Sequence, residues 1–349
     1  MPLTMRYSIC ITIAVFICTN NLSSIKLHHA GHMLPQQKPG PRVLHSLVYD
    51  ATAEATLLLD GYHLPQNPEF GELWQWNGEH WKKTSEKATP VCFGSAAAYD
   101  AKRKKLIVFG GLHARGSEEG KLLNETWQYD GKQWSRLNVA GPQPRFGHAM
   151  VYDSNREKII LFGGSPGFQK EAFGDTWEWD GTAWKKINVE GPAARADFAM
   201  VYDSRIKKVI LFGGQGKKLD EEPERKDLND TWSWDGRKWE KINEAGPGAR
   251  IRHKMVYDGK SGLTILYGGD RKNQNNNSGI ASLDDMWTWN GSEWKEIKKT
   301  NQWPGKRMMH AMAYDEARNK TILYSGGNGE IIIEDTWEWD GKEWKKISW

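Results

Sequence analysis

The sequence predicts an all-β fold built from one four-stranded unit that occurs six times. The tract Trp-Glu-Trp-Asp-Gly at residues 177–181 recurs with variations at 74–78, 127–131, 232–236, 287–291 and 337–341. A further Trp follows three residues after the Gly of each tract, and a Tyr-Asp pair precedes each tract. These motifs contain 17 of the 19 Trp, eleven in the tracts and six downstream, so the repeat accounts for the unusual composition. Six equal β units of about 50 residues favour a six-bladed β-propeller.

Composition excludes several other classes of protein. Hydrophobic residues make up 38% of the 349 residues, and aromatic residues are frequent, which is not typical of a disordered chain. The formal net charge is only +4 and is spread along the sequence. No basic stretch therefore indicates a nucleic-acid interface, and no acidic tail is present.

The first two strands of each unit follow from hydrophobic patterning. The first strand ends in the Tyr-Asp pair, as in residues 148–153. The second is an apolar run that leads into Gly-Gly, as in residues 159–164, and an uninterrupted run of this length indicates a strand buried on both faces. Small residues such as Ala96, Ala97 and Ala98 place the first strand innermost, where the blades converge.

The last two strands form a hairpin. The Trp-x-Trp alternation puts both indole rings on one face of the third strand. Asp-Gly or Asn-Gly then predicts a tight turn, and the fourth strand carries Lys, as in residues 184–187, which suits an exposed sheet edge. A straight solenoid is the alternative arrangement, but its terminal repeats would need distinct polar caps, and neither repeat 1 nor repeat 6 has them. We therefore expect a ring that closes by packing of blade 1 against blade 6.

The predicted domain organisation is a leader, a linker and one propeller. Residues 1–24 are interpreted as a signal peptide and residues 25–40 as a linker. Residues 41–349 form the propeller, with blades at approximately 41–88, 89–141, 142–191, 192–246, 247–303 and 304–349.

The N-terminal segment predicts export. Arg6 precedes the apolar run from Ile9 to Cys18, which is followed by polar residues, as in a secretory signal peptide. Ten apolar residues are too few to span a bilayer, so no membrane span is expected after signal removal. A lipoprotein anchor on Cys18 is disfavoured because Ile17 stands where a small residue is needed. The expected location is the periplasm or the exterior.

Cysteine and histidine usage gives no sign of a metal or cofactor. Removal of the leader leaves Cys92 alone, so no internal disulfide is possible, and a buried thiol of this kind is usually inert. The His residues lie on separate blades, too far apart to converge on one ion. We expect no metal and no cofactor.

The repeat resembles the Kelch family. Gly-Gly after an apolar strand, the Trp-Asp-Gly turn and the downstream Trp are similar to bacterial exported Kelch repeats and to the propeller of galactose oxidase. The resemblance covers residues 41–349, and repeat 1 departs from it with Asp60-Gly61 in place of Gly-Gly. It implies a six- or seven-bladed propeller but no single activity, because Kelch propellers include many binding modules and a few enzymes.

One face of the predicted propeller carries the variable loops. The strand meander puts the Tyr-Asp and Asp-Gly turns on one face, and the loops after Gly-Gly on the other. These loops are 62–71, 112–124, 165–174, 215–229, 270–284 and 328–334. Variable loops on a rigid scaffold commonly carry binding residues, so this face is the candidate site.

The same face gathers recurring Arg, His and acidic residues. The candidate ligand-binding residues are Arg42, Arg145, Arg195, Arg250, Arg307, His45 and Arg252. Each of the six units also has an acid at the start of its Trp-x-Trp strand: Glu72, Glu125, Asp175, Asp230, Asp285 and Asp335. The Arg residues either form an anion-attracting ring around the axial mouth or pair with these acids and tie neighbouring blades together. Departures from symmetry are the expected places of specific recognition: Cys92, Ser95, Asp197, Phe198 and Arg252.

The function that we expect is an exported binding scaffold, monomeric, that recognises a protein segment or a glycan on the face with the long loops. The alternative is an enzyme on an acidic sugar, similar to the epimerase activity of some periplasmic Kelch propellers. Arg145, Arg250 or Arg307 would then bind the carboxylate, and His148, His253 or His310 would transfer a proton.

Overall fold

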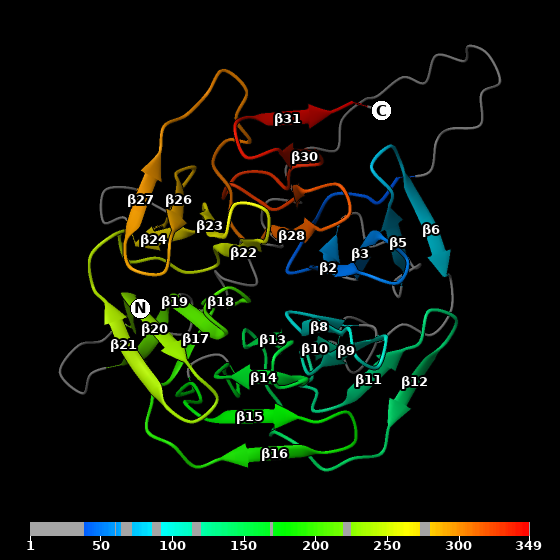
Figure 1. Ribbon diagram of the computed structural model, residues 1–349, viewed down its shortest axis with the longest axis vertical. Coiled ribbons are helices and arrows are strands. Elements are labelled where there is room, and N and C mark those ends of the chain that lie inside the picture. The colour runs from blue at the N-terminus through cyan, green and yellow to red at the C-terminus, as the bar shows by residue number, and fades with distance from the viewer. Residues whose placement is uncertain are drawn as a thin grey trace, which may run out of the picture.

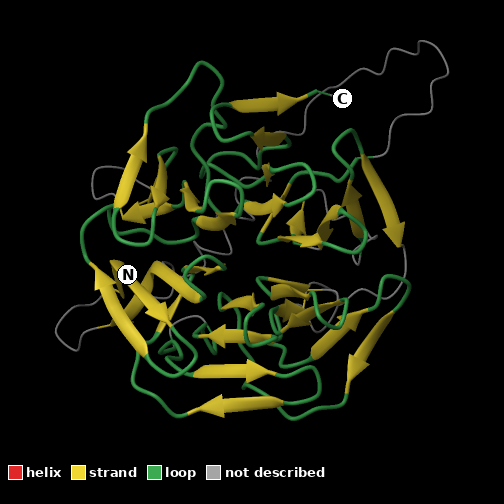
Figure 2. Cartoon of the chain, viewed as in Figure 1, coloured by secondary structure: helices red, strands yellow, loops and turns green. Residues whose placement is uncertain are grey.

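The computed structural model describes residues 38–59, 61–63, 72–85, 92–113, 120–167, 170–218, 225–272 and 280–348. These residues form six four-stranded antiparallel blades around one axis, and they contain strands, turns and loops but no helix (Figures 1 and 2). The predicted six-bladed propeller is therefore confirmed. The expected leader and lipid-anchor residue (Cys18), most of the linker, and Asp60 lie outside the described residues.

Each blade is a simple meander from the axis outward. Blade 1 comprises β2 (Ser46–Asp50), β3 (Ala55–Leu59), β5 (Leu73–Trp76) and β6 (Trp81–Ser85). Blade 2 comprises β8 (Ala96–Asp100), β9 (Lys105–Phe109), β11 (Thr126–Tyr129) and β12 (Trp134–Leu137). Blade 3 comprises β13 (Ala149–Asp153), β14 (Lys158–Phe162), β15 (Thr176–Trp179) and β16 (Trp184–Ile187).

The second half of the ring repeats this order. Blade 4 comprises β18 (Ala199–Asp203), β19 (Lys208–Lys218), β20 (Arg225–Trp234) and β21 (Trp239–Asn243). Blade 5 comprises β22 (Lys254–Asp258), β23 (Leu263–Tyr267), β26 (Met286–Trp289) and β27 (Trp294–Ile297). Blade 6 comprises β28 (Ala311–Asp315), β29 (Lys320–Tyr324), β30 (Thr336–Trp339) and β31 (Trp344–Ile347).

Short strands lie between the inner strands and the long loops. They are β1 (Arg42–Val43), β4 (Tyr62–His63), β7 (Cys92–Phe93), β10 (Leu112–His113), β17 (Arg195–Ala196), β24 (Asp270–Lys272) and β25 (Ile280–Ser282). In blade 4 the expected loop at 215–229 is partly a hairpin, because β19 and β20 continue to pair beyond Gly-Gly as far as Lys218 and Arg225.

We call the interface between consecutive blades a seam and number it by its two blades. The core is divided among the seams, where apolar side chains of facing sheets interdigitate. The second Trp of the Trp-x-Trp strand lies here beside the downstream Trp of its blade, as in Trp179 and Trp184, with ring centroids 5.4 Å apart. Seam 6/1 closes the ring in the same way: Trp81 Nε1 donates to Thr336 Oγ1 at 3.1 Å, and Trp76 Nε1 donates to Glu338.

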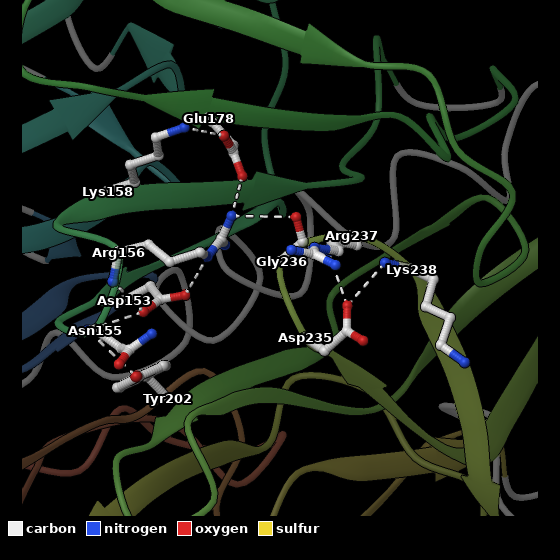
Figure 3. A network of polar contacts seen from close by, with 10 residues as sticks. All are labelled: Asp153, Asn155, Arg156, Lys158, Glu178, Tyr202, Asp235, Gly236, Arg237 and Lys238. Carbon is white, nitrogen blue, oxygen red and sulfur yellow. Dashed lines mark hydrogen bonds and ion pairs between the residues drawn. The ribbon is translucent and has the colours of Figure 1, made fainter.

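On the face with the short turns, Arg side chains join neighbouring blades. Arg156 of blade 3 donates to Asp153 and Glu178 of its own blade and to the carbonyl of Gly236 in blade 4 (Figure 3). Asn155 N also donates to the hydroxyl of Tyr202 in blade 4, at 3.3 Å. Three more Arg residues lie against the corresponding Gly of the next blade: Arg103 on Gly181, Arg205 on Gly291 and Arg318 on Gly78.

The second Gly of Gly-Gly is required by close packing. Gly214 has φ of +100°, and a Cβ there would lie 2.6 Å from Phe198 Cβ and 2.9 Å from the carbonyl oxygen of Ala196. The equivalent Gly164 meets His148 Cβ at 2.7 Å. The Gly-Gly motif therefore allows the innermost backbone segments to approach each other.

We predict that Gly214→Ala destabilises the fold far more than Gly341→Ala. Both residues have positive φ, which costs an L-residue about 1–2 kcal/mol, but Gly341 has no neighbouring atom within 4 Å. The clash should add about 1–3 kcal/mol at Gly214. Urea unfolding of the two variants measures the difference, and equal losses would contradict the packing role.

Candidate functional site

The five repeated Arg residues are buried beneath the face with the long loops. Arg145, Arg195 and Arg307 have no exposed surface, and Arg42 and Arg250 have 1% and 2%. Arg195 forms a bidentate pair with Asp230, with Nη1–Oδ1 and Nη2–Oδ2 distances of 2.7 and 2.9 Å. Arg195 also donates from Nη1 to the carbonyl of Gly213 and from Nε to that of Ala193.

This arrangement recurs in every blade that has the Arg. The acids are Asp175 for Arg145, Asp285 for Arg250, Asp335 for Arg307 and Glu72 for Arg42, the last at 3.4 Å. Each acid also accepts from the indole of the Trp two residues later, as Asp230 does from Trp232 at 2.7 Å. Of the two interpretations of the Arg residues, the pairing with the repeat acids is observed, but each pair lies within one blade, so the expectation that these pairs tie neighbouring blades together is wrong.

Pairing shifts the titration of the acids. Burial alone would raise the pKa of Asp175, Asp230 and Asp285, but hydrogen bonds and charge from the facing Arg outweigh burial and lower it. The carboxylates are therefore ionised, and each guanidinium has its charge neutralised inside the fold. Ligand binding by these five Arg residues stays a prediction, and their burial and pairing argue against it.

The predicted catalytic His residues occupy packing positions in the seams. His148, His253 and His310, together with His45, are at most 6% exposed. Each ring makes an edge contact with an aromatic ring of the preceding blade, such as His148 with Phe109 at 5.7 Å between centroids. In blade 4 the same position is Phe198, which makes the same contact with Phe162 at 5.7 Å. Because Phe can occupy this position, its primary role is packing.

Burial keeps these imidazoles neutral. Loss of hydration, followed by the charge of Arg145, lowers the pKa of His148 from 6.5 to about 3. The pKa values of His45, His253 and His310 are lowered well below the ordinary value for the same two reasons. A general acid or base for neutral pH needs a pKa near 7 and access to substrate, and these residues have neither property. The geometry does not favour the acidic-sugar enzyme.

Six residues close a backbone ring around the propeller axis. Each lies two residues after the Arg position of its blade, and its N–H donates to the carbonyl of the equivalent residue in the preceding blade, at 2.8–3.1 Å. All six have φ between 56° and 65°. This axial ring consists of Leu44, Gly94, Gly147, Asp197, Arg252 and Met309.

Side chains around the axial ring differ from blade to blade. Leu44 and Met309 are apolar and partly exposed, and the half-buried Phe93 and Phe146 lie next to Gly94 and Gly147 in the chain. Asp197 and Arg252 are charged and partly exposed. The ring positions are therefore apolar in blades 6 and 1, carry no side chain in blades 2 and 3, and are charged in blades 4 and 5.

The charged half is a connected group of side chains. Arg252 donates from Nε and Nη2 to the two carboxylate oxygens of Asp270, at 2.8 and 2.5 Å. Burial raises the pKa of Asp270 to about 6, although Arg252 opposes the shift, and burial also raises the pKa of Asp227. The N–H of Lys272 donates to Asp227 Oδ2 at 3.3 Å, which joins the loops of blades 4 and 5.

Sequence reasoning identified Arg252 and Asp197 but missed Lys254. Lys254 is the first residue of β22, where the other inner strands have Ser46, Ala96, Ala149, Ala199 and Ala311. Burial lowers its pKa, and the charge of Asp197 partly offsets that effect. Alignment of the six repeats would have shown this Lys among five small residues. No group of three or more His, Cys, Asp or Glu residues in the described part of the chain is arranged to hold a metal ion.

Comparison with known proteins identifies the type of propeller. Residues 179–349 match the model of the KLHDC2/KLHL20/DRC7 Kelch-repeats domain. A solved structure described as "Structure of YjhT" superposes with a TM-score of 0.67 at 16% identity, over 90% of this chain and 99% of the other. The fold is a Kelch-type propeller. No curated protein sequence matched the chain.

Kelch propellers are in general protein-interaction scaffolds, and 420 chains of known structure match this chain. A fold this widespread does not select a ligand, so the function must be argued from the mouth of the propeller. Within the part of the chain that is described, no helix has the length and apolar character needed to cross a bilayer.

We predict that His148→Phe raises stability in acid with little effect at pH 8. Because the folded-state pKa is depressed from 6.5 to about 3, the unfolded chain takes up a proton first, and stability is lost as pH falls through this window. At pH 5 this His should cost about 2 kcal/mol, a loss that the Phe variant avoids. Urea unfolding at pH 8 and pH 5 tests this. An unchanged pH dependence would show that the imidazole is protonated in the fold.

Proposed function

We propose that this chain is a binding scaffold that recognises a protein segment at the mouth formed by the axial ring. The observation that carries the proposal is the contrast between a regular interior and an irregular mouth. The repeated Arg residues pair with the repeated acids, and the repeated His residues pack on neighbouring rings, whereas the partly exposed ring positions hold Leu44, Asp197, Arg252 and Met309. Side chains that vary on an invariant backbone provide specificity without disturbing the fold.

The chemistry of the mouth suits an extended segment with both an apolar and a polar side chain. Leu44 and Met309 offer apolar contact on one side of the axis, and Asp197 with the Arg252–Asp270 pair offers charged hydrogen-bonding groups on the other. Ile331, in the blade 6 loop on the same face, is 56% exposed and is the one exposed large hydrophobic residue among those described. A glycan remains the second candidate ligand from the sequence.

The proposed location of the protein rests on the sequence alone. We propose that the chain is exported, because in its first 24 residues a basic residue is followed by an apolar run and then by polar residues, as in a signal peptide. Its partner would then be a protein of the cell envelope or the exterior. Monomeric behaviour stays a prediction.

The proposal predicts peptide binding that depends on the mouth. We expect panning of a random peptide library on the immobilised protein to enrich peptides that bind wild type. Leu44→Ala and Met309→Ala should each weaken this binding about tenfold, because each removes apolar contact area of about one side chain. Biolayer interferometry measures the affinity, and thermal melting checks that the variants are folded.

Lys132→Ala is the matched control, because Lys132 is exposed on the opposite face in the turn after β11 and should leave affinity unchanged. Enriched peptides that bind all four proteins equally would place recognition elsewhere. Binding on a glycan array that is lost in Met309→Ala, with no peptide enriched, would select the glycan instead.

A further inference from the structure

We propose that the propeller opens at seam 1/2, between the first two blades, rather than at seam 6/1, where the first and last blades meet. Among the described residues, seam 1/2 lacks three contacts that link blades at most other seams: an Arg against a Gly, an indole hydrogen bond, and the ring contact of a His or Phe. Each absence has a residue substitution behind it, and none of these substitutions is at an axial-ring position, on which the proposed function rests.

The first absence is the Arg contact on the face with the short turns. Arg103, Arg156, Arg205 and Arg318 lie against a Gly of the next blade across seams 2/3, 3/4, 4/5 and 6/1. Blade 1 has Thr52 and Ala53 at the corresponding positions of its turn, and no atom lies within 4 Å of the position for a Cβ on Gly131 in blade 2.

The second absence is an indole hydrogen bond inside the seam. The downstream Trp donates to a Thr of the preceding blade in four seams: Trp184 to Thr126, Trp239 to Thr176, Trp294 to Thr231 and Trp81 to Thr336, at 2.9–3.1 Å. In blade 1 the Thr position is Leu73. The buried Nε1 of Trp134 consequently has no hydrogen-bond partner.

The third absence lies at the start of blade 2, where Ser95 replaces the His or Phe that contacts an aromatic ring of the preceding blade elsewhere. Cys92 replaces the buried Arg of the other blades, and because that Arg pairs with the acid of its own blade, this change removes a contact inside blade 2 rather than across the seam. Glu125, the acid of blade 2, pairs instead with Arg136 at 2.9 Å on the surface, where their side chains are 27% and 63% exposed. A surface pair of this kind contributes little to stability, in contrast to the buried Arg–Asp pairs of blades 3 to 6.

Between the described residues of blades 1 and 2, the contacts across the seam are mainly apolar. Leu57, Leu59, Leu106 and Val108 pack across it, and the rings of Tyr62 and Phe93 meet edge to face with centroids 5.7 Å apart. The hydroxyls of Thr52 and Tyr99 are 2.6 Å apart, and Gly94 N donates to Leu44 O in the axial ring. Apolar contact is not directional, so blades held in this way can separate or slide without leaving many buried polar groups unsatisfied.

Seam 5/6 is the nearest rival. It also lacks the Arg contact, because no Arg lies against Gly341 of blade 6. Met286 stands at the Thr position of blade 5, so Trp344 Nε1 has no hydrogen-bond partner. However, it keeps the ring contact of His310 with Tyr267, and the Tyr267 hydroxyl donates to the carbonyl oxygen of Gly305 in blade 6 at 3.0 Å. Seam 6/1 keeps all three kinds of contact, which secures the first blade to the last.

Cys92 is a built-in reporter of this opening. Cys92 is 2% exposed and lies in β7, at the blade 2 side of the seam, so it reacts with a thiol reagent only when the structure that covers it opens. The experiment labels the full chain with iodoacetamide in native buffer and reads the Cys92 peptide by mass spectrometry, which separates it from Cys10 and Cys18. The control is Cys92→Ser/Ala199→Cys. It puts a thiol at the first residue of β18 in seam 4/5, which has every contact, and the Ala199 that it replaces is 5% exposed.

We expect Cys92 to react at least tenfold faster than the thiol at position 199. Ala53→Arg restores the Arg of the turn, and we expect it to slow the labelling of Cys92 at least threefold. The same substitution added to Cys92→Ser/Ala199→Cys should leave the labelling rate of the thiol at position 199 unchanged. Equal labelling rates for the two thiols, or a rate for Cys92 that Ala53→Arg does not change, would overturn the proposal. Position 53 is exposed, so this variant does not disturb the core.

Discussion

The axial ring is the constraint on which the rest of the structure depends. Six N–H groups each donate to the preceding blade, so the peptide dipoles run head to tail in a closed circle, and hydrogen bonds in such a chain polarise and strengthen one another. The ring is possible only because all six residues adopt positive φ. This includes Leu44 and Arg252, for which the left-handed conformation is energetically unfavourable. The blades meet at this circle, so their separation from the axis is fixed by backbone geometry.

Around this circle, the repeat motifs act as joints between blades. The paired Gly residues let the innermost segments approach, the His or Phe position fills the space between them, and the buried Arg joins its own strand ends to the acid. The repeated Arg, His and acidic residues, which the sequence suggests as candidate functional residues, therefore serve largely to hold the propeller together. The side chains that differ from blade to blade and are partly exposed, such as Asp197 and Arg252, are those on which the proposed function rests.

The sequence predicted the fold because Trp, Gly-Gly and Tyr-Asp recur in register, and each has a strong local preference for a strand or turn. The pairing of Arg with the repeat acid was one of two interpretations, since both residues repeat in step, but pairs between neighbouring blades were expected, whereas Arg195 and Asp230 belong to one blade. The axial ring could not be predicted, because its six residues share a backbone conformation and no side-chain type. The pairing of β19 with β20 beyond Gly-Gly was missed because its charged residues resemble a solvated loop. Whether each His faced a ligand or a neighbouring ring depended on seam geometry, which composition does not encode.

The axial ring also has a consequence for protein engineering. Its hydrogen bonds are made entirely by main-chain atoms, so the side chains at its six positions are not needed to hold it closed. Four of these positions already carry Leu, Asp, Arg and Met at the same φ, which shows that the scaffold tolerates chemically unrelated residues there. The axial ring could therefore serve as a scaffold for engineered binding. A combinatorial library of side chains at its six positions could be selected for binding to new targets, while the propeller beneath the ring stays unchanged.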